Sequence, residues 1–215
     1  MLGFVEEIVL LQLDEGHGGF ADLPLAAADI VIAGAAVMEL ALQNRVDSDL
    51  QRLFVTDRSP TGDAMLDDAV ARLADGGELT TASAIERLTG SAAAYREEAL
   101  RRLVAKGILR EENGRHFWVF RTRRYPVVDD TEQREVRARL RQVLLTEEIP
   151  DPRDVVLICL IEACELLGLV LSTDEAAAAR ARVEQLSRLD LIGQAVTRAA
   201  AEIRFLIRHA AASVF

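Results

Sequence analysis

Apolar residues recur at helical spacing along most of the chain. Residues 4–13 follow this spacing, and residues 25–43 are rich in alanine and apolar nearly all round, which predicts a buried helix that Pro24 would begin. Further helices are predicted after a turn at residues 59–63 to about residue 74, and over residues 79–88, 92–105, 132–145, 154–171, 174–189 and 191–212.

Two segments depart from the helical period and predict β-hairpins. Residues 44–56 place short apolar stretches on either side of Ser48 and Asp49. Residues 108–120 place apolar stretches on either side of residues 111–114, where an Asn-Gly pair favours a tight hairpin turn.

The order of elements over residues 79–120 is helix, helix, glycine and hairpin, which is the layout of a winged-helix unit. The chain has no internal repeat and no long polar linker. We therefore predict a mainly α fold, with residues 1–215 forming a single domain that contains this winged-helix-like segment.

Composition narrows the class of protein. The chain of 215 residues is 50% hydrophobic, which excludes a disordered chain. Two cysteines, Cys159 and Cys164, exclude a disulfide scaffold and a four-cysteine zinc site. The longest apolar run, residues 155–171, contains two glutamates and falls short of the roughly 20 residues that span a bilayer. We expect a soluble cytoplasmic protein with no cofactor.

Candidate catalytic features are weak. The glycines of residues 16–19 lack the Gly-Lys-Ser/Thr ending of a phosphate loop. Adjacent acidic residues such as Glu6 and Glu7, or Asp67 and Asp68, are expected on solvated faces, because neighbours on a helix point apart. The cysteines are expected to be buried thiols. No nucleophile or metal motif is present, so we predict no enzymatic activity.

Basic residues cluster between Arg96 and Arg124. This segment has nine basic and four acidic residues, whereas the whole chain has a net charge of −10. It also contains His116, Phe117 and Trp118. Such a segment can contact an anionic surface, with aromatic side chains at the interface. The alternative is that its arginines pair with the acidic excess of the chain.

The order of several short motifs resembles the Golgi phosphoprotein 3 family, a group of phosphoinositide-binding peripheral membrane proteins with relatives in bacteria. These motifs are Phe4-Val5-Glu6-Glu7-Ile8-Val9-Leu10-Leu11, Glu39-Leu40-Ala41-Leu42, Pro60-Thr61-Gly62-Asp63 with Leu66-Asp67, Leu103-Val104-Ala105-Lys106-Gly107-Ile108-Leu109 and Arg124-Tyr125-Pro126-Val127. The resemblance implies a helix bundle surrounded by amphipathic helices, a projecting β-hairpin and no catalysis.

The resemblance also implies a lipid pocket for phosphatidylinositol 4-phosphate, made by a tryptophan and three arginines. Aligned without gaps, those positions hold Pro24, Ala33, Ala93 and Arg96, so only Arg96 is kept. Losing two arginines removes two charge-assisted phosphate contacts, each worth about 1.5–3 kcal/mol. We therefore expect the family pocket to be largely lost here.

Our leading hypothesis is a non-enzymatic, bacterial-type member that contacts an anionic lipid head group or an acidic protein surface, peripherally on a membrane. The candidate site residues are Arg96, Arg115, Phe117, Trp118, Arg121, Arg123 and Arg124. The alternatives are a nucleic-acid-binding winged helix, which Glu97 and Glu98 disfavour, and a purely oligomeric interaction module that uses the hairpin.

Overall fold

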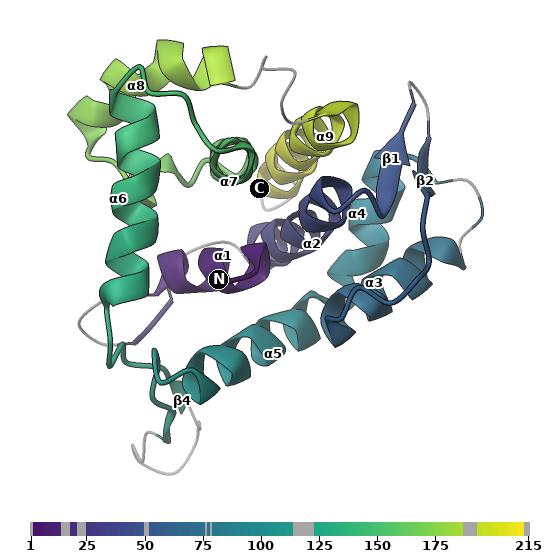
Figure 1. The fold of residues 1–215 in the computed structure, drawn as a ribbon, viewed down its shortest axis with the longest axis horizontal. Coiled ribbons are helices and arrows are strands. Elements are labelled where there is room, and N and C mark those ends of the chain that lie inside the picture. Colours follow the sequence, from purple (N-terminus) through teal and green to yellow (C-terminus); the bar gives the residue numbers. More distant parts are fainter. Residues whose placement is uncertain are drawn as a thin grey trace.

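The computed structural model describes residues 2–13, 18–20, 25–49, 52–75, 77, 79–113, 123–186 and 193–212. The helices are α1 Phe4–Gln12, α2 Leu25–Leu42, α3 Ala64–Ala74, α4 Thr81–Thr89, α5 Ala92–Ala105, α6 Thr131–Leu145, α7 Pro152–Ala163, α8 Thr173–Leu186 and α9 Gly193–Ala212, with a 3₁₀ turn η1 at Leu167–Leu169. The strands are β1 Val46–Ser48, β2 Leu53–Val55, β3 Glu112–Asn113 and β4 Arg123–Arg124. This confirms the predicted mainly helical class with small hairpins (Figure 1).

Helix α2 lies in the middle of the fold because its sequence provides no polar face (Figure 1). Its side chains from Val31 to Met38 are fully buried, and α1, α4, α5, α7 and α9 pack around it. At Gly34 a Cβ atom would lie 2.4 Å from Cδ1 of Ile203 on α9. The missing side chain therefore lets α9 lie directly against α2.

Capping side chains begin the outer helices where the sequence predicts. Asp63 caps α3, and its Oδ1 accepts from the backbone N–H of Met65 at 2.8 Å and of Leu66 at 3.4 Å. Thr80 caps α4 and accepts from the N–H of Ser83 at 3.1 Å. The predicted turn before α3 is confirmed.

The first hairpin is confirmed, because β1 pairs with β2 antiparallel. The second hairpin has a different register from the predicted one. Glu112 pairs with Arg124 and Asn113 with Arg123, so Asn113 lies in a strand and not in the turn.

Burial fixes the register of the second hairpin. Leu109 forms a bridge with Val127, and the N–H of Arg110 donates to the carbonyl of Pro126 at 3.0 Å. Leu109 and Tyr125 are both buried, at 2% and 5% exposure. Because a shift of one residue would move such side chains to the solvent face, long-range packing outweighs the local Asn-Gly preference.

The predicted helix over residues 154–171 is wrong in its second half. Helix α7 ends at Ala163, Glu165 has a left-handed φ of 60°, and the chain continues into η1. Leu166 and Leu171 remain buried after this turn. The apolar residues after Ala163 therefore remain part of the core although the helix has ended. Hydrophobic periodicity alone cannot distinguish a buried helix from a buried turn.

Replacing Gly18 with alanine should destabilise the fold by about 1–3 kcal/mol. Gly18 has a φ of +60°, and a Cβ would lie 2.3 Å from the backbone nitrogen of Pro126. The matched control is Gly19→Ala, because nothing lies within 4 Å of a Cβ at Gly19. Urea denaturation measures both variants, and equal stability of the two would contradict this packing.

Candidate functional site

Arg96 lies near the N-terminal end of α5 and faces α2. Its Nη2 is 2.9 Å from Oδ1 of Asp29, and the two side chains are 19% and 28% exposed. Ala33, one turn further along α2, is buried, and Ala93 is exposed. The one arginine that the resemblance retains is therefore already paired with a carboxylate. Pro24, the fourth pocket position, lies outside the described residues.

Arg124 lies in β4, beyond the C-terminal end of α5 (Figure 1). Its side chain is exposed, and no carboxylate among the described residues pairs with it. Glu112, which faces it across the ladder, pairs with Arg110 at 2.5 Å. Arg96 lies about 14 Å of helix rise from the end of α5 that β4 adjoins, so the two arginines occupy different ends of this helix.

The other candidate residues follow β3 in the sequence. Arg115, Phe117, Trp118 and Arg121 lie outside the described residues, and Arg123 is described only through its backbone in β4. Their place in a common site stays a prediction.

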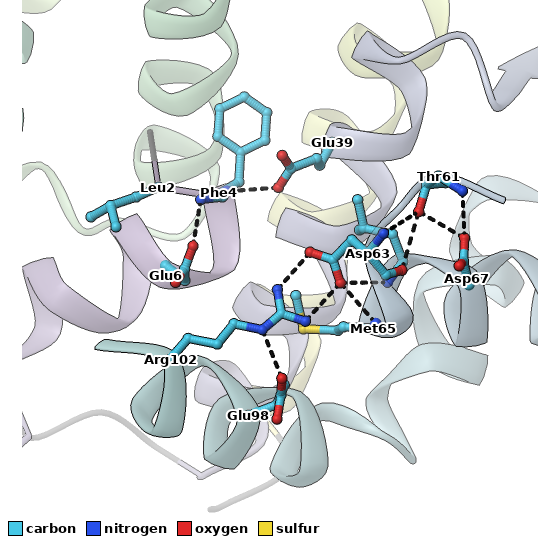
Figure 2. Close-up of polar contacts among 12 residues, drawn as sticks. Leu2, Phe4, Glu6, Glu39, Thr61, Asp63, Met65, Asp67, Glu98 and Arg102 are labelled. Atoms are coloured by element: carbon cyan, nitrogen blue, oxygen red, sulfur yellow. Dashed lines mark hydrogen bonds and ion pairs between the residues drawn. The ribbon is translucent and has the colours of Figure 1, made fainter. Parts of the chain in front are cut away.

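The basic residues of α5 and its C-terminal turn form ion pairs with neighbouring carboxylates. Arg102 binds Asp63 through two hydrogen bonds of 2.5 and 2.8 Å and binds Glu98 at 2.7 Å, as Figure 2 shows. Arg101 also binds Glu98, at 2.7 Å, and Lys106 binds Glu6 at 2.6 Å. These contacts support the alternative that the arginines compensate the acidic excess.

Asp63 joins α3 to α5. It caps α3 and accepts both hydrogen bonds from Arg102, which lower the pKa of its carboxyl group. Hydrogen bonds from Arg101 and Arg102 lower the pKa of Glu98 to about 2. Next to Asp63, the backbone N–H and the hydroxyl of Thr61 both donate to Oδ1 of Asp67 at 2.7 Å (Figure 2). The Pro-Thr-Gly-Asp motif thus has a structural role in this chain.

The prediction that Glu6 and Glu7 lie on a solvated face is wrong. They are 3% and 2% exposed. Oε2 of Glu6 accepts from the backbone N–H of Gly3 at 2.8 Å, while Glu7 lies 3.0 Å from Nη2 of Arg139. Each carboxylate is buried because a basic side chain or a backbone donor meets it, as buried charge requires.

The same cluster of buried charges extends to α2 and α7. Oε2 of Glu39 accepts from the backbone N–H of Phe4 at 2.7 Å, and Arg139 lies 2.5 Å from Asp154. Burial raises the pKa of Glu7, Glu39 and Asp154. Arg153 lies 3.6 Å from Glu39 and places its guanidinium 4.1 Å from the centre of the Phe4 ring.

Sequence reasoning missed Arg139 and Arg153 as members of this cluster. A signal was present, since Glu39 interrupts the otherwise apolar stretch over residues 30–42, and a carboxylate there requires a partner. The partner itself could not be found, because α6 and α7 are remote from α2 in sequence.

The cysteines fit their predicted role as buried thiols. Burial raises the pKa of Cys159 to about 12 and also raises that of Cys164, which keeps both as unreactive thiols. Within the described ranges, no group of His, Cys, Asp and Glu side chains could hold a metal ion. None of the helices in the described part of the chain is long and apolar enough to cross a membrane.

The fold defines a helical bundle protein, wrapped around one apolar helix and carrying two short hairpins. The profile of the Golgi phosphoprotein 3 (GPP34) family matches residues 4–203, so the chain belongs to this family. A vacuolar protein sorting-associated protein 74 from Eremothecium gossypii is 29% identical over 209 residues, covering 80% of this chain. The match covers 62% of that relative's own length.

Replacing Asp63 with alanine should lower the free energy of unfolding by about 2–4 kcal/mol, because the α3 cap and the Arg102 contacts are both lost. Asp63→Asn keeps a capping oxygen and should cost about half as much. The exposed Asp75 at the other end of α3 provides the control, since Asp75→Asn should change stability by less than about 0.5 kcal/mol.

The Asp63→Asn effect should also depend on pH. Because the pKa of Asp63 is lowered in the folded state, its charge stabilises the fold above about pH 4, and this stabilisation is lost as the pH falls through the folded pKa. Urea denaturation at a series of pH values should show the difference from wild type shrinking towards low pH. A difference that is constant with pH would contradict the role of the charge.

Proposed function

We propose that this chain is a non-enzymatic adaptor-type protein that contacts an anionic membrane surface through its basic hairpin region. The observation that carries the proposal is Arg124, an exposed arginine with no carboxylate partner among the described residues, at the base of a hairpin on the edge of the bundle. Arg115, Arg121 and Arg123 would add to this charge, and Phe117 and Trp118 would supply interfacial contact.

Family membership supports a role at membranes. The family is named for the Golgi, and the fungal relative carries the name of a protein associated with vacuolar sorting. The resemblance implies phosphoinositide binding, but the pocket positions Ala33 and Ala93 provide no guanidinium for a phosphate. The proposed contact is therefore driven by charge density more than by recognition of one head group.

The nucleic-acid alternative receives less support. Its recognition helix would be α5, whose Arg96 and Arg102 are engaged by carboxylates, and Glu97 is exposed on the same helix. A carboxylate facing a phosphate backbone opposes binding. A gel-shift assay with duplex DNA at low salt should show no complex.

Replacing Arg124 with glutamate should weaken binding to anionic vesicles about thirtyfold, because a basic residue near such a surface contributes about 1 kcal/mol and charge reversal costs about twice that amount. Co-sedimentation with phosphatidylcholine vesicles, with and without phosphatidylglycerol, measures the effect. The control is Arg58→Glu, an equal charge change at another exposed arginine, in the loop after β2. Equal wild-type binding to neutral and anionic vesicles at low salt would refute the proposal.

Replacing Asp29 with asparagine should strengthen binding to the same anionic vesicles about fivefold, because Arg96 loses the carboxylate that neutralises it. The double variant Asp29→Asn with Arg96→Ala should return to wild-type binding or below it. If the double variant kept the full gain, the effect would not act through Arg96, and Arg96 would not contact the surface.

A further inference from the structure

A second candidate site lies away from the hairpin, where α7, η1, α8 and α9 line a solvent-open cavity of about 1180 Å³. Helix α7 packs against both α8 and α9, and the cavity occupies the space beyond its C-terminal end. The volume exceeds the roughly 300–1,000 Å³ of common small-molecule sites. It is therefore large enough for a ligand with an extended apolar part.

One wall of the cavity is apolar. It contains Leu167 of η1, the buried Leu171 and, from α8, Ala176 and Val183. Apolar surface of this kind binds hydrocarbon at about 0.8 kcal/mol per methylene group removed from water. A purely polar ligand would leave this wall unused.

Arginines from two helices provide the charge. Arg180 of α8 and Arg208 of α9 line the cavity, and both are exposed with no ion-pair partner among the described residues. Arg204, one turn before Arg208, binds Glu162, while its Nε is buried with no acceptor. The site therefore presents guanidinium groups that the described part of the chain does not neutralise.

The acidic residues that line the cavity do not neutralise all of its arginines, so a small net positive charge remains. Glu162 is engaged by Arg204, and Glu184 has an interaction partner. Among the described carboxylates of the lining, Glu165 is left to balance the charges of Arg180 and Arg208. Two uncompensated guanidinium groups against one carboxylate favour a ligand with a single negative charge.

The N-terminus of α8 does not supply the anion contact. The side chain of Glu175 accepts from the N–H of Ser172 at 2.9 Å, and the hydroxyl of Ser172 accepts from the N–H of Glu175 at 3.4 Å, so the helix end is capped from within. From the apolar wall and the unpaired arginines, we propose that this cavity binds a single-chain amphiphile with one negative charge, of the fatty-acid type.

Isothermal titration calorimetry with dodecanoate tests the proposal on the full chain. We expect one saturable site, about a hundredfold or more weaker binding of butanoate, which cannot cover the apolar wall, and no saturable binding of dodecyltrimethylammonium. Arg180→Ala and Arg208→Ala should each weaken dodecanoate about tenfold. Arg134→Ala, an exposed arginine on α6 that does not line the cavity, should have no effect.

A steric pair of variants locates the site. Ala177 of α8 is exposed and lines the cavity, whereas its exposed neighbour Ala178 is absent from the lining. Ala177→Trp should abolish dodecanoate binding and Ala178→Trp should leave it intact, with circular dichroism confirming that both variants fold. Equal behaviour of the two variants, or equal binding of the cationic and anionic amphiphiles, would overturn the proposal. Vesicle binding by the hairpin does not bear on either outcome.

Discussion

The burial of residues 30–40 of α2 on all sides is the constraint on which the rest of the fold depends. A helix without a polar face over this stretch must be covered on every side, and this requires several amphipathic helices that each turn one apolar stripe inward. Ala33, Ala35 and Ala36 keep the helix narrow, and Gly34 admits Ile203 of α9 at close range. The short distance between α2 and α9 is thus set by a missing side chain.

The buried charges follow from the same arrangement. Glu39 lies on the central helix, so it cannot reach solvent and must be met by donors from the covering elements, here Phe4 and Arg153. A buried ion pair of this kind adds little net stability, but removal of one partner leaves an uncompensated charge. The cluster therefore restricts which helices can lie beside α1 and α2 more than it strengthens the core.

Most helices could be predicted from the sequence, because strong periodicity and local caps such as Thr80 coincide. Two of the failures share one physical cause, which is that contacts between distant segments outweighed local signals. The Asn-Gly pair at Asn113 gave way to the burial of Leu109 and Tyr125. Glu6 and Glu7 looked solvated because their partners Lys106 and Arg139 come from much later in the chain.

The candidate site was less predictable than the fold. Counting charges between Arg96 and Arg124 identified a basic segment, but the count could not show that Arg96 pairs with Asp29 or that Arg102 pairs with Asp63. The formal charge summed along a sequence therefore overstates the electrostatic potential at the protein surface. Ion pairs between segments that are distant in the sequence neutralise many of the charges that a ligand would otherwise meet.

The left-handed turn at Glu165 has a consequence for the shape of the molecule. Had α7 continued to Leu171, it would extend about 12 Å further as a straight helix. A single backbone dihedral, held at a local cost of about 1–2 kcal/mol in a residue other than glycine, thus converts core-forming sequence into the wall of a cavity. The shape of this cavity therefore depends on the position at which α7 ends.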